Sequence, residues 1–113
     1  MAQNGAGNLG GHRPTRAEID LDALAANYRT VRGAVGQQVR IMSVVKANAY
    51  GHGAIACARR LVGAGTDWLA VALPEEGLAL RAAGIEVPIL VLGGFWPGQE
   101  SLCLAHRLVP VIY

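Results

Sequence analysis

Lys46 is the side chain in this sequence best placed to do chemistry, because it is the only lysine beside nine arginines. It directly follows the apolar run from Met42 to Val45. We therefore expect it at the carboxyl end of a buried parallel strand, where α/β folds place their binding and catalytic groups. A lysine at a strand end commonly extends its ammonium into solvent while its methylenes cover apolar surface. Burial would instead lower the pKa of the amine, and a neutral amine can condense with an aldehyde or move a proton.

The turn after Lys46, YGHG, carries groups that suit an aldehyde cofactor with a phosphate. Pyridoxal phosphate is the commonest such cofactor in amino-acid chemistry. The phenol of Tyr50 can donate to a phosphate oxygen, although a turn aromatic can equally pack at a rim. Gly51 and Gly53 allow close backbone approach ahead of a predicted helix, whereas His52 is expected to bond to backbone or water. The glycine spacings of a Walker A loop or a dinucleotide fingerprint are absent.

The composition argues against several classes of partner. Hydrophobic residues make up 52% of the 113 residues and charged residues 16%, which is typical of a parallel sheet covered by helices. The net charge of +2 is too small to indicate a nucleic acid or an acidic membrane surface. No segment approaches the length of a membrane-spanning helix. We therefore expect neither a nucleic-acid nor a membrane partner.

The two cysteines indicate a reducing compartment. Cys57 and Cys103 form neither a CxxC pair nor a metal-spaced cluster, so they are expected to be small buried thiols, and no metal site is expected. Residues 1–13 are rich in glycine and asparagine and lack the apolar run of a signal peptide. We expect a disordered tail there and a cytoplasmic protein.

Apolar periodicity predicts alternating strands and helices. The predicted strands cover residues 15–21, 38–47, 67–73, 87–93 and 109–113. The predicted helices run from an N-cap at Asp22 to residues 33–36, from Ile55 to residue 63 or 65, from Pro74 to Gly84, and over residues 99–108.

This alternation predicts β/α units with a parallel sheet, either in a doubly wound open sheet or in a (β/α)8 barrel. Three strand starts, at Asp67, Pro88 and Val109, lie 21 residues apart. A barrel needs about 250 residues to close. Because the chain stops on a strand that no helix follows, we expect a partial sequence.

Four stretches resemble one family in the same order along the chain. They are RAEIDLDALAANY from Arg16, SVVKANAYGHG from Ser43, WLAVALPEEGLALRAAGI from Trp68 and PILVLGG from Pro88. The chain is identified from them as a member of the alanine racemases, which are fold-type III pyridoxal-phosphate enzymes. The resemblance covers residues 13–113 and implies the N-terminal part of a (β/α)8 TIM-type barrel, incomplete here. It implies about the first third of a family member, without the C-terminal β domain, and a homodimer for the full-length protein.

The resemblance also implies roles for individual residues. Lys46 would attach pyridoxal phosphate covalently and serve as the base on the D-alanine face, and Tyr50 would contact the phosphate. Leu92 would pack near the cofactor ring, or be ordinary barrel core. The second base, a tyrosine of the partner subunit, matches nothing in these 113 residues. The implied function is interconversion of L-alanine and D-alanine, which supplies D-alanine for peptidoglycan.

Three alternatives stay open. Serine or broad-specificity amino-acid racemases share this fold and similar lysine motifs. A non-catalytic pyridoxal-phosphate-binding single barrel has an equivalent lysine, but in a VSK context without AYGHG. An α/β domain with an ordinary lysine would leave the motif matches as coincidence. From the resemblance, we expect the 113 residues alone to be inactive and to aggregate or stay partly molten, because an unclosed barrel exposes apolar surface.

Overall fold

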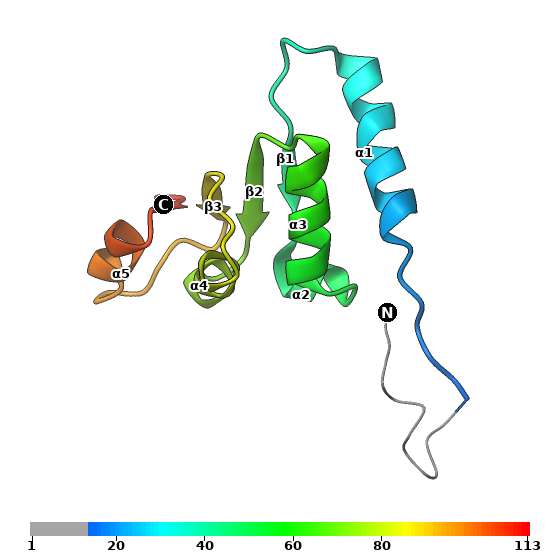
Figure 1. The fold of residues 1–113 in the computed structure, drawn as a ribbon. Helices are drawn as coiled ribbons and strands as arrows, with labels where there is room; N and C mark the ends of the chain where they lie inside the picture. Colours follow the sequence, from blue (N-terminus) through cyan, green and yellow to red (C-terminus); the bar gives the residue numbers. More distant parts are fainter. Residues whose placement is uncertain (1–13) are drawn as a thin grey trace.

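The computed structural model describes residues 14–113, so the tail expected over residues 1–13 lies outside the described residues. Helices and strands alternate along the described chain, except that α2 and α3 both lie between β1 and β2 (Figure 1). The helices are α1 (Leu21–Val35), α2 (Lys46–Tyr50), α3 (Ala54–Ala64), α4 (Pro74–Ala82) and α5 (Glu100–Ala105). The strands are β1 (Met42–Val44), β2 (Trp68–Val71), β3 (Ile89–Val91) and β4 (Leu108–Pro110). None of these helices is long and apolar enough to cross a membrane.

The four strands form one parallel sheet in the order β1-β2-β3-β4. Val44 pairs with Ala70, Ala70 with Leu90, and Leu90 with Val109, so these residues lie at one level across the sheet. A doubly wound sheet reverses its strand order at a switch point, whereas a barrel adds each strand beside the last. The uninterrupted order is therefore that of a barrel wall.

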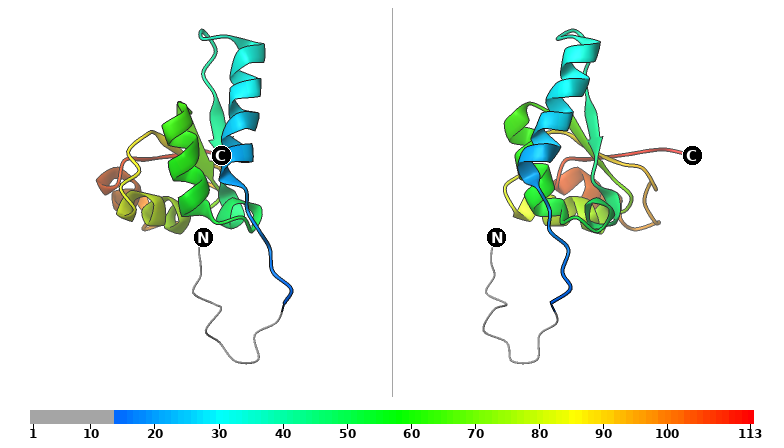
Figure 2. Two further views of the ribbon diagram at one scale, coloured as in Figure 1. Left: turned by 45° about the vertical axis from the view of Figure 1, so that its right-hand side comes forward. Right: turned by 90° about the vertical axis from the view of Figure 1, so that its right-hand side faces the viewer.

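The two faces of the sheet differ in what covers them. Side chains alternate between faces along each strand. Leu69, Val71, Ile89 and Val91 are fully buried in the core that the sheet forms with α3, α4 and α5. On the other face, Met42, Val44 and Val109 remain about 40% exposed, although they are apolar. The right-hand view of Figure 2 shows α3 on one side of the sheet, while the C-terminal end of the chain leaves on the other. The exposed apolar face is the one that would point into a closed barrel.

The first predicted strand is wrong, and so is the predicted N-cap. Residues 15–20 have no regular structure, because no described strand pairs with them. Helix α1 begins two residues earlier than an Asp22 cap requires. Asp20 has an extended backbone and its carboxylate accepts from the Ala23 N–H at 3.0 Å, which is N-cap geometry. Asp22 instead lies in the first helical turn and pairs with Arg60.

The later elements are confirmed in type; α3 has about the predicted length, and the others are shorter than predicted. Helix α4 begins at Pro74 as expected, and α1 ends at the Gly36 cap. The strand expected over residues 38–47 is regular only in β1, because residues 38–39 still belong to the turn before it and the chain turns sharply after Val45. The helix expected over residues 99–108 ends at Ala105, and Leu108 belongs instead to β4, where it pairs with Ile89.

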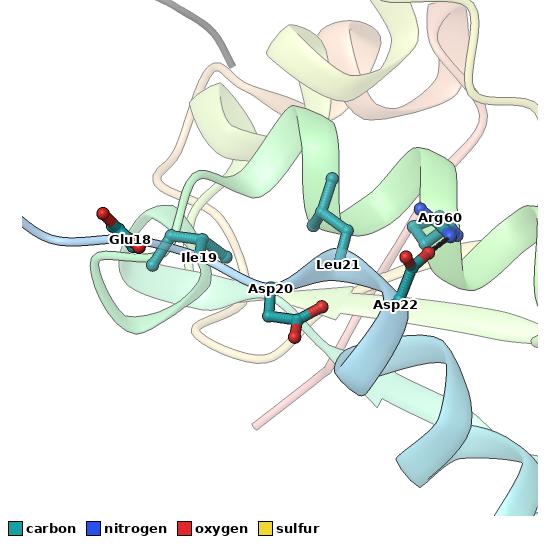
Figure 3. Close-up of a pocket in the computed structure, with 6 residues that line it drawn as sticks. All are labelled: Glu18, Ile19, Asp20, Leu21, Asp22 and Arg60. Atoms are coloured by element: carbon teal, nitrogen blue, oxygen red, sulfur yellow. Dashed lines mark hydrogen bonds and ion pairs between the residues drawn. The ribbon is translucent and has the colours of Figure 1, made fainter.

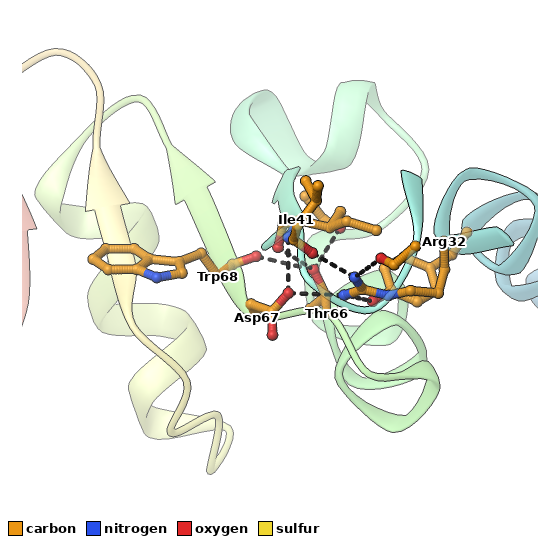
Figure 4. Close-up of polar contacts among 9 residues, drawn as sticks. Arg32, Ile41, Thr66, Asp67 and Trp68 are labelled. Carbon is orange, nitrogen blue, oxygen red and sulfur yellow. Dashed lines mark hydrogen bonds and ion pairs between the residues drawn. The ribbon is translucent and has the colours of Figure 1, made fainter. Parts of the chain in front are cut away.

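A polar cluster at the amino end of the strands fixes α1 and β1 to β2 (Figure 4). The Thr66 hydroxyl is buried and lies 2.8 Å from the Ser43 hydroxyl and 3.2 Å from the Ile41 carbonyl oxygen. The Asp67 carboxylate accepts from the Ile41 N–H and from Arg32, each at 2.8 Å. These two contacts hold the pKa of Asp67 below its usual range, the Ile41 bond having the larger effect. The cluster fixes β1 against β2, and Lys46 follows two residues after the last residue of β1.

Candidate active site

Lys46 lies at the carboxyl end of β1, as predicted. The Val45 N–H donates to the Ala70 carbonyl oxygen at 2.8 Å, which continues the sheet ladder one residue beyond β1. Val45 then leaves the extended conformation, with ψ of 25°, and the strand stops at Lys46. The Lys46 side chain is half-buried. Lys46 therefore lies at the rim of the sheet, where it is neither fully buried nor fully exposed.

Leu92 lies at the same end of the sheet, two strands away. The Leu92 N–H donates to the Val71 carbonyl oxygen at 2.8 Å, which extends β3 past Val91. The β2–β3 ladder continues past Val91, since the Gly93 N–H donates to the Ala72 carbonyl oxygen at 2.9 Å. Lys46 and Leu92 thus follow the ends of β1 and β3, which lie on either side of β2, two strand spacings or roughly 10 Å apart. Leu92 is half-buried, so its side chain remains accessible to a molecule bound at this edge.

The segment labelled α2 is a left-handed turn, which the sequence analysis missed. Ala47, Asn48, Ala49 and Tyr50 have φ of 53°, 56°, 54° and 56°. Such a conformation costs about 1–2 kcal/mol for each residue other than glycine. Among the four, only asparagine favours it intrinsically, so the residue types carry no clear signal of a left-handed turn. Strain of this kind persists only where surrounding contacts impose it.

Hydrogen bonds within the turn account for its shape. The Gly53 N–H donates to the Asn48 carbonyl oxygen at 2.9 Å, and the Ala54 N–H to the Asn48 side-chain oxygen at 2.8 Å. His52 Nδ1 lies 2.8 Å from the Ala49 carbonyl oxygen, which confirms that this histidine bonds to backbone. The N–H of Gly51 also donates inside the turn. The N–H groups of Gly51 and Gly53 are therefore already hydrogen-bonded within the turn and do not face an anion. Both glycines adopt the positive φ that the turn requires.

Tyr50 ends this turn with its side chain in solvent. The residue is 59% exposed, and its hydroxyl has no hydrogen bond to the part of the chain that the structure describes. It lies four residues after Lys46 at the same edge of the sheet. Lys46 and Tyr50 thus supply an amine and a phenol at this edge, and Leu92 supplies an apolar side chain.

Glu76 is the residue at this edge whose contacts the sequence analysis missed. One carboxylate oxygen accepts from the Ala47 N–H at 2.7 Å. The other accepts from the N–H groups of Ala72, at 2.7 Å, and Leu73, at 2.9 Å. The sequence alone indicates only that the negative charge of Glu76 is favourable near the N-terminus of α4. The partner 29 residues away becomes apparent only once the strands are adjacent.

An open pocket elsewhere carries no comparable chemistry (Figure 3). It lies at the start of α1 and is lined by Glu18, Ile19, Asp20, Leu21, Asp22 and Arg60. Two of its carboxylates already serve the fold, since Asp20 caps α1 and Asp22 pairs with Arg60. Across residues 14–113, no group of three or more His, Cys, Asp or Glu side chains could hold a metal ion.

Comparisons with known proteins agree with this arrangement. Residues 19–113 match the family model described as alanine racemase, N-terminal domain. The alanine racemase of Halothermothrix orenii is 55% identical over 100 residues, which is 88% of this chain and 26% of that protein. The catabolic alanine racemase of Pseudomonas aeruginosa is 52% identical over 102 residues, covering 89% of this chain and 28% of that protein.

Solved structures give the same result. An alanine racemase from E. faecalis superposes with a TM-score of 0.86 at 35% identity, covering 92% of this chain and 28% of that one. One from Bartonella henselae, with covalently bound pyridoxal phosphate, gives 0.74 at 41% identity, covering 81% and 27%. The chain spans about a quarter of the length of the curated relatives it matches, somewhat less than the third expected. The chain therefore belongs to the alanine racemase family, and its parallel sheet is the N-terminal part of that family's barrel.

Proposed function

We propose that the complete protein is a pyridoxal-phosphate-dependent isomerase that interconverts L-alanine and D-alanine. The observation that carries the proposal is the position of Lys46. The chain's single lysine lies at the carboxyl end of the first strand of the sheet, within the family match. Barrel enzymes place their chemistry at this end of the strands.

The residues at this edge fit the cofactor by their chemistry. Lys46 offers a primary amine that can bond covalently to an aldehyde, Tyr50 a phenol that can donate to a phosphate, and Leu92 an apolar side chain for a flat ring. When bound, pyridoxal phosphate supplies an electron sink for the charge left as the α-proton departs. Lys46, released from the cofactor by substrate, would then accept or return that proton on one face.

Inversion at a carbon centre needs a second proton-transfer group on the opposite face. Among the described groups at this edge, the phenol of Tyr50 is assigned to the phosphate and the carboxylate of Glu76 already accepts three backbone N–H bonds, so we assign the second proton transfer to neither. We propose that a partner subunit supplies it and that the complete protein is a homodimer acting on free alanine. D-Alanine made in this way would serve peptidoglycan synthesis. The free, buried thiols of Cys57 and Cys103 favour a reducing compartment, in accord with a cytoplasmic enzyme.

The test is covalent trapping at Lys46. The complete protein is loaded with pyridoxal phosphate, reduced with borohydride and digested. We expect a pyridoxyl mass on the peptide that contains Lys46, which is unambiguous because this region has no other lysine. The Lys46→Arg variant keeps the positive charge and is the matched control; it should lose the label, the cofactor colour and the turnover. An unmodified Lys46 peptide at full cofactor loading would refute the assignment.

A chiral assay then identifies the substrate. L-Alanine and L-serine are offered separately, and the appearance of each D-enantiomer is followed. We expect alanine to be turned over with the higher kcat/KM. Faster turnover of serine would replace alanine racemisation with the serine alternative and leave the cofactor assignment intact.

A further inference from the structure

Glu76 joins three segments at the edge of the sheet that holds Lys46. Its side chain is half-buried and comes from the first turn of α4. The Oε1 atom accepts from the N–H groups of Ala72 and Leu73, the residues that connect β2 to α4. The Oε2 atom accepts from the N–H of Ala47 at 2.7 Å. The carboxylate therefore bridges the loop after β2 and the residue that follows Lys46.

The two carboxylate oxygens of Glu76 make different contacts. The bonds of Oε1 cap the N-terminus of α4, which is a local and structural task. The bond of Oε2 does not contribute to that cap. It reaches Ala47, the first residue of the left-handed turn and the covalent neighbour of Lys46. A charged acceptor makes a stronger bond to an amide than a neutral one does. The Ala47 amide is thus held in a conformation that alanine otherwise avoids.

We infer that Glu76 is a positioning residue for Lys46. It acts through the Ala47 amide, which fixes where the backbone leaves β1 and hence where the amine is presented. This inference rests on the proposed function for its catalytic consequence. The contact itself belongs to the fold and can be measured without activity.

Glu76→Gln separates the two tasks in the complete protein. A glutamine side chain keeps one carbonyl oxygen, which retains both bonds of the α4 cap when it faces Ala72 and Leu73. Its NH2 group then faces the Ala47 N–H, so a donor meets a donor and this bond alone is lost. Glu76→Asp is a second variant, one methylene too short to cap α4 and reach Ala47 together. Glu75→Gln is the matched control, because Glu75 is an adjacent, exposed carboxylate.

Three readouts distinguish positioning from stability. We expect amide exchange at Ala47 to speed up on the order of tenfold in Glu76→Gln, with exchange in the core of β2 unchanged. The rate of borohydride-trapped labelling of Lys46 and kcat should each fall on the order of tenfold, with KM for alanine changed less. Glu75→Gln should match the parent protein in all three, and Glu76→Asp should follow Glu76→Gln.

Two results would overturn the inference. One is an Ala47 exchange rate in both Glu76 variants that matches Glu75→Gln. The other is faster exchange at Ala47 with unchanged labelling of Lys46 and unchanged kcat. Failure of the proposed function gives a different pattern: the parent protein itself would neither label at Lys46 nor racemise alanine. The exchange measurement would still decide whether Glu76 holds the turn.

Discussion

Gly93 lies where β2 and β3 end, next to Leu92, and leaves no space for a side chain. A Cβ atom added there would lie 2.6 Å from the Ala72 carbonyl oxygen, a distance that such contacts do not reach. The obstacle is backbone, and the Gly93 N–H donates to the same oxygen at 2.9 Å. Neither group can rotate away. Gly93→Ala should therefore push the ends of the two strands apart at the candidate active site.

The magnitude follows from two opposing effects. Forcing an extra carbon into a packed site costs about 1–3 kcal/mol of the free energy of unfolding. Alanine has less freedom than glycine in the unfolded chain, which offsets about 0.5–1 kcal/mol of that cost. We expect a net destabilisation centred on about 1 kcal/mol and no larger than about 2.5 kcal/mol. Gly33→Ala is the matched control, because a Cβ at this position in α1 meets nothing within 4 Å. It should stabilise the protein by about 0.5–1 kcal/mol.

The assay compares the same substitution at two sites of the complete protein. Urea unfolding reports the free energy, and amide exchange at residue 93 reports local opening of the strand ends. Gly93→Ala should lower the urea midpoint and speed this exchange, while Gly33→Ala should raise the midpoint. If Gly93→Ala proved as stable as Gly33→Ala, the close approach to Ala72 would not be a real constraint and the reasoning would fail.

Two further predictions concern acid stability and the exposed face of the sheet. Because the Ile41 amide and Arg32 lower the pKa of Asp67, the stability it contributes is complete above its unfolded-state pKa of about 4 and is lost as pH falls through the lower folded-state value. Asp67→Asn should therefore flatten the acid side of a plot of urea midpoint against pH, and an unchanged slope would contradict this. The isolated 113 residues should bind a hydrophobic dye and aggregate through the face that carries Met42, Val44 and Val109, whereas a cooperative, monomeric thermal transition would speak against it.

Local pattern predicted the alternation of elements and the place of Lys46. Proline at the start of α4 and glycine at the end of α1 mark boundaries that the structure confirms. The apolar run before Lys46 indicated a strand whose carboxyl end would carry it. These signals lie within a few residues of the feature that they predict, which is why they could be read without a structure.

The errors have a common cause. Residues 15–21 alternate like a strand, but a strand needs a partner, and none of the described strands pairs with them. Asp22 was expected to cap the first helix, but Asp20 accepts the Ala23 N–H bond instead. Each error treats a local pattern as sufficient where a hydrogen-bond partner decided the outcome.

By itself, the sequence determined that a single lysine would follow a buried strand in a series of β/α units, because apolar spacing and turn residues act locally. Only the tertiary structure decided how that lysine is presented. The left-handed turn after it consists of residues that mostly disfavour it, and part of its support comes from Glu76, 29 residues beyond Ala47. The contact between Glu76 and Ala47 forms only when parallel strands bring their carboxyl ends to one edge. No local sequence pattern could therefore predict it.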